Sequence, residues 1–278
     1  MPIRLKRTFP FLSSEARPVV PAVRISGAIG MRSALAPARG AAEIAGALEY
    51  AFSFKHAPAV AIVINSPGGS PVQSHMIHRR IRALAEAKQK PVLAFVEDLA
   101  ASGGYMVACA ADEIIADAAS VVGSIGVVSA GFGFVGLLDR LGVERRLHTA
   151  GSRKALLDPF SAERPEDVEH LREIQTDIHD HFITLVKQRR GDRLSSEGDL
   201  FNGLVWSGVR ARDLGLVDQL GTLNEVVLER FGATAQIRVI EPGRRPFLRR
   251  LFFRFGEAAA VGALATADEQ ALWSRYRL

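Results

Sequence analysis

Residues Ala59–Gly69, AVAIVINSPGG, carry the strongest indication of the fold. Its first seven residues form a continuous uncharged run that ends in Asn65. A strand covered by helices on both faces has this composition, whereas a strand with one wet face alternates apolar and polar residues. The glycine turn then breaks the run, and Ser70-Pro71-Val72-Gln73 has the form of a helix capping box with proline at the first helical position. This stretch therefore predicts a buried parallel strand, a tight turn and a helix.

The same alternation of strands and helices continues on both sides. Strands are predicted over Val19–Ser26 and Pro91–Val96 and in the short runs EIIA, SVV and GVVSA. Helices are predicted over Arg39–Phe54, in YMVACAA and over residues 165–190. Strands separated by helices are typical of βαβ units, so we expect an α/β fold with a largely parallel sheet. One compact domain over residues 19–240 is expected, between an N-terminal arm (1–18) and a C-terminal tail (241–278).

The tail is basic and aromatic. Five arginines fall between residues 244 and 254, among several phenylalanines, although the whole chain carries a net charge of only +5. Such a segment is predicted to be an amphipathic helix, which either lies peripherally on a membrane surface or packs on protein. The sequence has no zinc-ligand spacing, RNP-like strand or long basic helix, so no nucleic-acid partner is expected.

Targeting and redox signals are few. No apolar run reaches the roughly 18–20 residues of a membrane span, and the N-terminus lacks a signal-peptide core. A cytoplasmic protein is therefore expected. The single cysteine, Cys109, excludes an intramolecular disulfide framework and a cysteine-rich metal site, and its apolar neighbours favour a buried position.

Three glycine-containing turns follow predicted strands, at residues 65–69, 101–105 and 123–127. In open α/β sheets, ligands bind beyond the carboxyl ends of the strands, so these turns are predicted to converge on one pocket. Glycines leave backbone N–H groups accessible, and such donors can hold the oxyanion that forms when a carbonyl is attacked. The turns are thus suited to acyl-transfer chemistry.

Ser102 lies between a predicted strand and a small-residue helix, where it is either a nucleophile or a helix N-cap. A serine nucleophile needs a base, and no histidine occurs between His78 and His148. Lys154 is the other candidate base. A lysine serves as base only when its pKa falls by about 3 units from roughly 10.4, a cost of about 4 kcal/mol that burial can supply. An exposed loop lysine is the alternative interpretation.

Five segments in order resemble the SppA (signal peptide peptidase A) peptidases of the ClpP/crotonase superfamily. They are INSPGGS (64–70), ASGGYMVACAADEIIA (101–116), VGSIGVV (122–128), AGSRKALLDPF (150–160) and LVWSGVRARDLGLVDQLGTLNEVV (204–227). The resemblance implies a ClpP/crotonase-like fold, with a largely parallel sheet of repeated ββα-type units and flanking helices. It also implies a homo-oligomeric ring that cleaves signal peptides and other unfolded, apolar segments without a metal or organic cofactor.

The resemblance also implies a role for each matching residue. Ser102 is the nucleophile, and Lys154 is the general base, from the same or an adjoining subunit. Ser124 orients that lysine by a hydrogen bond. Gly69 and Gly103 supply the oxyanion-hole amides, with Gly68 as a neighbour. The N-terminal membrane anchor of many relatives is not evident here, and the C-terminal tail could take its place.

Two other functions remain open. A crotonase-type enzyme would hold a coenzyme A thioester in a similar oxyanion hole and use carboxylates such as Glu97 and Asp98. A scaffold protein could keep the fold without activity. A ClpP-like Ser-His-Asp peptidase is disfavoured because no histidine follows Ser102 at a suitable place.

Overall fold

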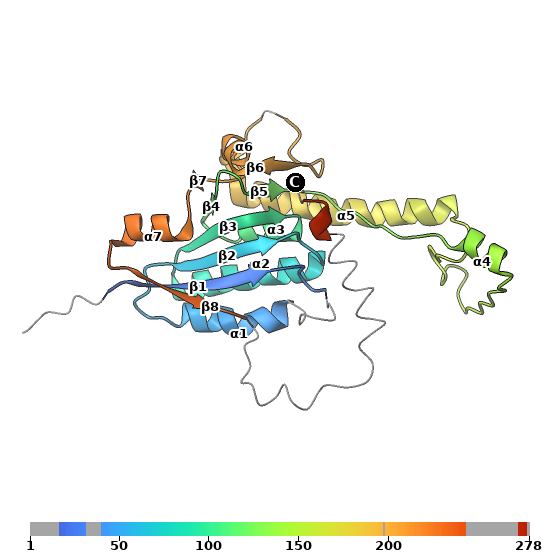
Figure 1. Ribbon diagram of the computed structural model, residues 1–278, viewed down its shortest axis with the longest axis horizontal. Coiled ribbons are helices and arrows are strands. Elements are labelled where there is room, and N and C mark those ends of the chain that lie inside the picture. Colours follow the sequence, from blue (N-terminus) through green and yellow to red (C-terminus); the bar gives the residue numbers. More distant parts are fainter. Residues whose placement is uncertain (1–16, 32–39, 197, 243–271, 277–278) are drawn as a thin grey trace, which may run out of the picture.

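The computed structural model describes residues 17–31, 40–196, 198–242 and 272–276 (Figure 1). The predicted N-terminal arm and most of the predicted tail lie outside these residues. The described elements, in chain order, are β1 (Val19–Ser26), α1 (Ala41–Phe52), β2 (Val60–Ser66), α2 (Pro71–Lys88), β3 (Val92–Ala101), α3 (Gly103–Ala108), β4 (Glu113–Ala116), β5 (Val121–Gly123), α4 (Val135–Leu141), α5 (Pro165–Arg190), a 3-10 helix (Gly191–Arg193), β6 (Val205–Ser207), α6 (Gly208–Asp213), β7 (Gln219–Leu220), α7 (Leu223–Phe231) and β8 (Gln236–Ile240).

The strands form one sheet in the order β6-β5-β3-β2-β1-β8, with β4 and β7 off this path. Every pairing is parallel except that of β5 with β6. The long strand β3 forks the sheet, because Leu93–Val96 pairs with β4 and Leu99–Ala101 pairs with β5. Ser102 follows the end of the second branch, next to β5.

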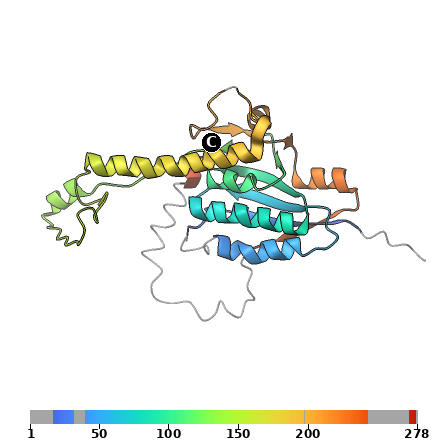
Figure 2. The same ribbon diagram turned by 180° about the vertical axis from the view of Figure 1, so that it is seen from behind.

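The sheet is covered on both faces. Alternate residues of β2 enter two separate cores: Ile62 and Ile64 pack with α1, α2, α3 and α5, whereas Ala61 and Val63 pack with α7. Figure 2 shows α1, α2 and α5 running across the first of these faces. The prediction of a strand buried on both faces is therefore confirmed, as is the largely parallel α/β sheet.

The cap of α2 is confirmed in part. The Ser70 hydroxyl accepts a hydrogen bond from the Gln73 amide at 3.4 Å. The reciprocal half of the capping box is missing, because the Gln73 side chain instead accepts from the Ala41 amide at 2.9 Å and the Ser70 amide donates to Ile29. Gln73 thus joins the starts of α1 and α2.

The predicted strand in GVVSA is wrong. Residues 126–130 form no strand. After Gly126 the chain leaves the sheet and runs outward toward α4, so no neighbouring strand offers hydrogen bonds (Figure 1). SVV, by contrast, lies between β3 and β6 and is the strand β5.

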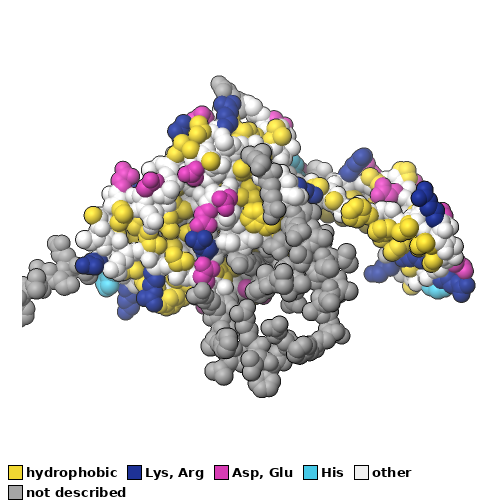
Figure 3. All heavy atoms as spheres, viewed as in Figure 1, with side chains coloured by type: hydrophobic (Ala, Val, Ile, Leu, Met, Phe, Trp, Pro, Cys, Tyr) yellow, Lys and Arg dark blue, Asp and Glu magenta, His cyan; other side chains and the backbone are white. Residues whose placement is uncertain are grey.

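Residues 128–174, called the arm below, project from the body and comprise α4, its flanking loops and the first turns of α5 (Figure 1). Large apolar side chains remain exposed along the arm, and Figure 3 shows a series of yellow, hydrophobic side chains on the face of the arm that it presents. They are Val128, Phe132, Phe134, Leu137, Leu141, Val143, Leu147, Phe160 and Ile174. Exposed apolar surfaces of this size are typical of interaction sites in other proteins.

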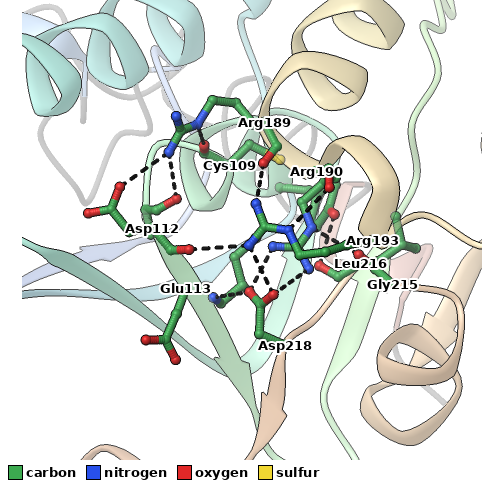
Figure 4. Close-up of polar contacts among 12 residues, drawn as sticks. Cys109, Asp112, Glu113, Arg189, Arg190, Arg193, Gly215, Leu216 and Asp218 are labelled. Atoms are coloured by element: carbon green, nitrogen blue, oxygen red, sulfur yellow. Dashed lines mark hydrogen bonds and ion pairs between the residues drawn. The ribbon is translucent and has the colours of Figure 1, made fainter.

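The opposite end of α5 is clamped to the body (Figure 4). Arg190, only 2% exposed, donates to both carboxylate oxygens of Asp218 at 2.7 and 2.9 Å. Arg189 donates to the carbonyl oxygen of Cys109 at 2.8 Å. Burial by itself would raise the pKa of Asp218, but hydrogen bonds from Arg190 hold that pKa below its ordinary value. α5 is therefore fixed at its C-terminal end and carries the arm at its other end.

No helix in the described ranges is long and apolar enough to cross a bilayer.

Candidate active site

Ser102 occupies a strained backbone position at the start of α3. Its φ is 51° and its ψ is −120°. A non-glycine residue in such a conformation costs of order 1–3 kcal/mol and persists only where its surroundings enforce it. Here the Ser102 amide donates to the Gly123 carbonyl oxygen at 2.8 Å, and the Ser102 carbonyl oxygen accepts from the Met106 amide at 3.0 Å. These two bonds hold the serine in a sharp strand-to-helix turn.

The turn after β2 lies directly against this serine. A methyl group on Gly68 would come within 2.8 Å of Ser102 Cβ and 2.7 Å of the Gly103 nitrogen. Gly69 is equally tight against Ile29, whose carbonyl oxygen would lie 2.3 Å from an added Cβ. Both glycines have positive φ values, 96° and 138°. Only glycine allows the two turns to approach this closely.

The amides of this turn differ in what they bind. The Gly68 amide donates to the Ser66 hydroxyl at 3.1 Å and is thereby occupied. No acceptor is found among the described residues for the amide of Gly69. Gly103 is the first residue of α3, where an amide has no partner within the helix. Of the three glycines, Gly69 and Gly103 therefore keep amides for a ligand.

The predicted convergence of the three glycine turns is confirmed. Gly69, Ser102, Gly103 and Gly126 line one shallow hollow that opens to solvent. Its apolar side is formed by Pro71, Met106, Val127, Ile178 and Phe182. Ile178 and Phe182 belong to α5, so the helix that carries the arm also forms a wall of this hollow.

Ser124 lies beside this hollow but has an unforeseen partner. It follows Gly123, whose carbonyl oxygen accepts from Ser102, and it also has a positive φ of 53°. Its hydroxyl lies 2.9 Å from the hydroxyl of Tyr276, near the end of the chain. The sequence predicts a basic aromatic tail, but no sequence pattern predicts that Tyr276 contacts Ser124.

Lys154 is remote from Ser102 of the same chain. It is exposed, and the preceding residue, Arg153, lies 3.9 Å from Asp167 in the first turn of α5. Eleven residues along α5 separate Asp167 from Ile178 in the hollow, or about 16 Å at 1.5 Å per residue. Figure 1 shows the loop between α4 and α5, which bears Lys154, beside α4 at the far end of the arm. The structure brings together every other predicted site residue but not this lysine.

His179 lies at the site although no sequence pattern marks it as a site residue. Its Nε2 atom lies 3.0 Å from the carbonyl oxygen of Ile125, so α5 contacts the third glycine turn. The sequence shows it only as one of several histidines beside the apolar face of that helix.

The groups that other functions would need are engaged elsewhere. Glu97 pairs with Arg24 at 2.9 Å, and Asp98 accepts a hydrogen bond from Asn65 at 2.7 Å. Burial raises the pKa of Cys109 to about 12, so its thiol stays protonated. Within the described ranges, no group of three or more His, Cys, Asp or Glu side chains could hold a metal ion.

Comparison with known proteins gives consistent results. The model of Peptidase family S49 matches residues 85–235, just over half of the chain. The chain is 34% identical over 193 residues to Protease 4 of Haemophilus influenzae, which covers 68% of this chain and 30% of that protein. It is 49% identical over 290 residues to a protein of Brucella abortus named Na(+)/H(+) antiporter NhaA, which covers 100% of this chain and 39% of that protein.

The chain thus spans well under half the length of these curated relatives, and the transport activity in the second name is not assigned to it. Among solved structures, a mutant of the membrane-bound stomatin-specific protease 1510-N in complex with a substrate peptide aligns with a TM-score of 0.52. The two are 14% identical, and the alignment covers 90% of this chain and 99% of that one. This likeness shows that the two proteins share a fold. The chain therefore belongs to peptidase family S49.

Proposed function

We propose that this protein is a serine endopeptidase in which Ser102 is the nucleophile and Lys154 of a neighbouring copy is the general base. One observation carries the proposal: Ser102 is held in a strained turn between two glycine amides, while Lys154 sits on a projecting arm with an exposed apolar surface. A serine and a base on such separate parts of the chain become a dyad when two copies associate.

The reaction is acyl transfer. The neutral lysine removes the proton from the Ser102 hydroxyl, and the serine oxygen attacks the carbonyl carbon of a peptide bond. The amides of Gly69 and Gly103 hold the negative charge on the carbonyl oxygen. When the tetrahedral intermediate collapses, the lysine returns the proton to the leaving amine. Water then attacks the serine ester and releases the second product.

Association of copies also supplies the environment that the base needs. Lysine acts as a base only in its neutral form, which burial favours. Lys154 is exposed in the single chain, and the same arm exposes apolar side chains such as Phe132 and Leu141. Docking of the arm on another copy would bury these groups together. Ser124 is proposed to orient the incoming lysine by a hydrogen bond. This requires the hydrogen bond between the hydroxyls of Ser124 and Tyr276 to break.

The apolar wall of the hollow supports unfolded or signal-peptide-like segments as substrates. Met106, Ile178 and Phe182 would accept an apolar side chain beside the scissile bond. We also propose a closed homo-oligomeric ring, a cytoplasmic location and peripheral membrane contact through the C-terminal tail. No nucleic-acid partner is proposed.

The test is hydrolysis of casein and of fluorogenic peptides with apolar residues before the scissile bond, at pH 6–10. Ser102→Ala and Lys154→Ala should each lower kcat by at least about 10³-fold. Ser152→Ala, on the same turn as Lys154, and Lys55→Ala, an exposed lysine elsewhere, serve as controls and should stay near wild type. Full activity in Ser102→Ala would overturn the proposal.

A further inference from the structure

Asp167 is buried on a part of the molecule where its neighbours are exposed. It is 3% exposed, whereas Glu166 and Glu169 are exposed. A carboxylate is costly to bury unless its oxygens are paired. Arg164 donates to Oδ2 of Asp167 through two nitrogens, at 2.8 and 2.6 Å. The other oxygen, Oδ1, has no hydrogen-bond partner among the described residues.

The group facing this oxygen is Arg153. Its Nη1 atom lies 3.9 Å from Oδ1 of Asp167, close enough for an ion pair but too far for a hydrogen bond. Arg153 immediately precedes Lys154. A small inward movement of the turn would complete the hydrogen bond and satisfy the buried oxygen.

This pair is the sole ion pair that ties residues 150–156 to the rest of the described chain. The following residues are held differently: Asp158 pairs with Arg145, and the ring of Phe160 stacks on that of Phe134 with centroids 5.4 Å apart. Among the ion pairs of the described chain, only this one therefore holds the part of the loop that bears the lysine.

The backbone conformation of the turn determines the direction of the Lys154 side chain relative to that of Arg153. The amide of Lys154 donates to Gly151 at 3.2 Å, and that of Leu156 donates to Arg153 at 3.2 Å. Turns with bonds between residues three apart have about three residues per turn, so successive side chains diverge by about 120°. With Arg153 directed at Asp167, the side chain of Lys154 points away from it.

We propose that Asp167 is a positioning residue: it binds Arg153 and so fixes the turn that presents Lys154 to the neighbouring copy. The inference rests on the proposed function, since it concerns the same lysine. It assigns the buried carboxylate a part in catalysis beyond its stabilising effect at the N-terminus of α5.

The test compares Arg153→Gln, Asp167→Asn and the double variant in the full-length protein, with kcat and KM measured separately. Each single variant should lower kcat about 10- to 100-fold, as misplacement of a catalytic group does, with KM changed less than twofold. The double variant should be no worse than the poorer single, because both changes break one contact. Arg153→Lys should recover part of the lost kcat.

The matched control is Arg146→Gln, which removes an arginine from an exposed ion pair with Glu144 on the same arm and should leave kcat unchanged. Melting temperature and oligomeric state are measured for every variant. If Asp167→Asn fails to fold, Arg153→Gln carries the test, since Arg153 is half-exposed. Wild-type kcat in Arg153→Gln, or losses that multiply in the double variant, would overturn the inference.

The variant Lys154→Ala distinguishes failure of the positioning role from failure of the proposed function. An inactive Lys154→Ala beside a fully active Asp167→Asn rejects only the positioning role. An active Lys154→Ala rejects the proposed function itself.

Discussion

At the scale of single residues, glycines allow the segments around Ser102 to pack closely, because they have no side chain. An added Cβ on Gly103 would lie 2.2 Å from the hydroxyl oxygen of Ser74, and one on Gly104 would lie 2.7 Å from the Ser66 carbonyl oxygen. The helix start after Ser102 is thereby packed against the side chain of Ser74 on α2 and against the backbone at the end of β2. This closeness is what places the amides of Gly69 and Gly103 beside the serine.

Gly103→Ala tests this packing. The methyl group collides with Ser74, so we expect a loss of about 1–3 kcal/mol in the free energy of unfolding and a large loss of kcat. Adding Ser74→Ala removes the nearest colliding atom and should restore part of both. Chemical denaturation and peptide hydrolysis measure the two effects.

Gly131→Ala is the control, because no atom lies within 4 Å of an added Cβ there. If Gly103→Ala matched this control in stability and rate, the close packing of the turns would be refuted.

The sequence predicted much at this scale. Gly69, Ser102 and Gly103 line one hollow, and Ser124 follows the residue to which the Ser102 amide donates, because each lies after a strand of the same sheet. The occupied amide of Gly68 depends on a rotamer of Ser66 and could not be predicted. Whether the amides of Gly69 and Gly103 form an oxyanion hole remains a prediction.

At the scale of elements, α5 has two different halves. The sequence predicted one long amphipathic helix, and the bounds 165–190 are confirmed. Periodicity could not reveal that the apolar face is covered only toward the C-terminus: Phe182 and Leu185 are buried, whereas Ile174 is 41% exposed. A periodic pattern shows that a face will be buried, but it does not tell which chain buries it.

The contact of α2 with α5 contains a buried histidine. His78 is 8% exposed, and neither of its ring nitrogens has a hydrogen-bond partner among the described residues. Burial, then the charges of Arg189 and His75, lower the pKa of His78 from 6.5 to about 4. The ring of His75 also packs against that of His181 on α5, at 4.5 Å.

This shift predicts a pH dependence of stability. Between pH 6.5 and 4 the unfolded chain binds a proton at His78 that the folded chain does not, so stability falls as the pH falls. At pH 4.5 the loss relative to pH 8 should be about 2.5 kcal/mol from this residue. Denaturant unfolding at both pH values and one protein concentration measures it.

His78→Leu should lose less stability over this interval by about that amount. Equal pH dependence in wild type and His78→Leu would show that His78 titrates normally in the folded protein.

At the scale of the whole molecule, the apolar side chains of the body are largely buried within the chain, whereas many of those on the arm are exposed. The body has helices on both faces of its sheet, whereas the arm exposes apolar side chains such as Phe132, at 82%, and Leu141, at 65%. The sequence predicted a homo-oligomer only through a family resemblance, since a single-chain pattern does not identify what lies across an interface.

Leu137→Asp with Leu141→Asp tests the arm as the contact between copies. We expect smaller particles by sedimentation, unchanged far-UV circular dichroism and loss of peptidase activity, because buried charges oppose association. Leu228→Asp, on α7 and 43% exposed, is the control and should leave particle size unchanged. Association that survives the two arm substitutions would place the contact elsewhere.

The most direct measurement of the central claim is the activity of mixed assemblies of Ser102→Ala and Lys154→Ala. Neither variant is expected to be active alone. In randomly mixed assemblies, about one site in four combines the intact Ser102 of a Lys154→Ala copy with the intact Lys154 of a Ser102→Ala copy. A dyad shared between copies predicts about a quarter of wild-type activity after co-expression and none when the double variant replaces either partner. Mixed assemblies without activity would contradict a dyad shared between copies.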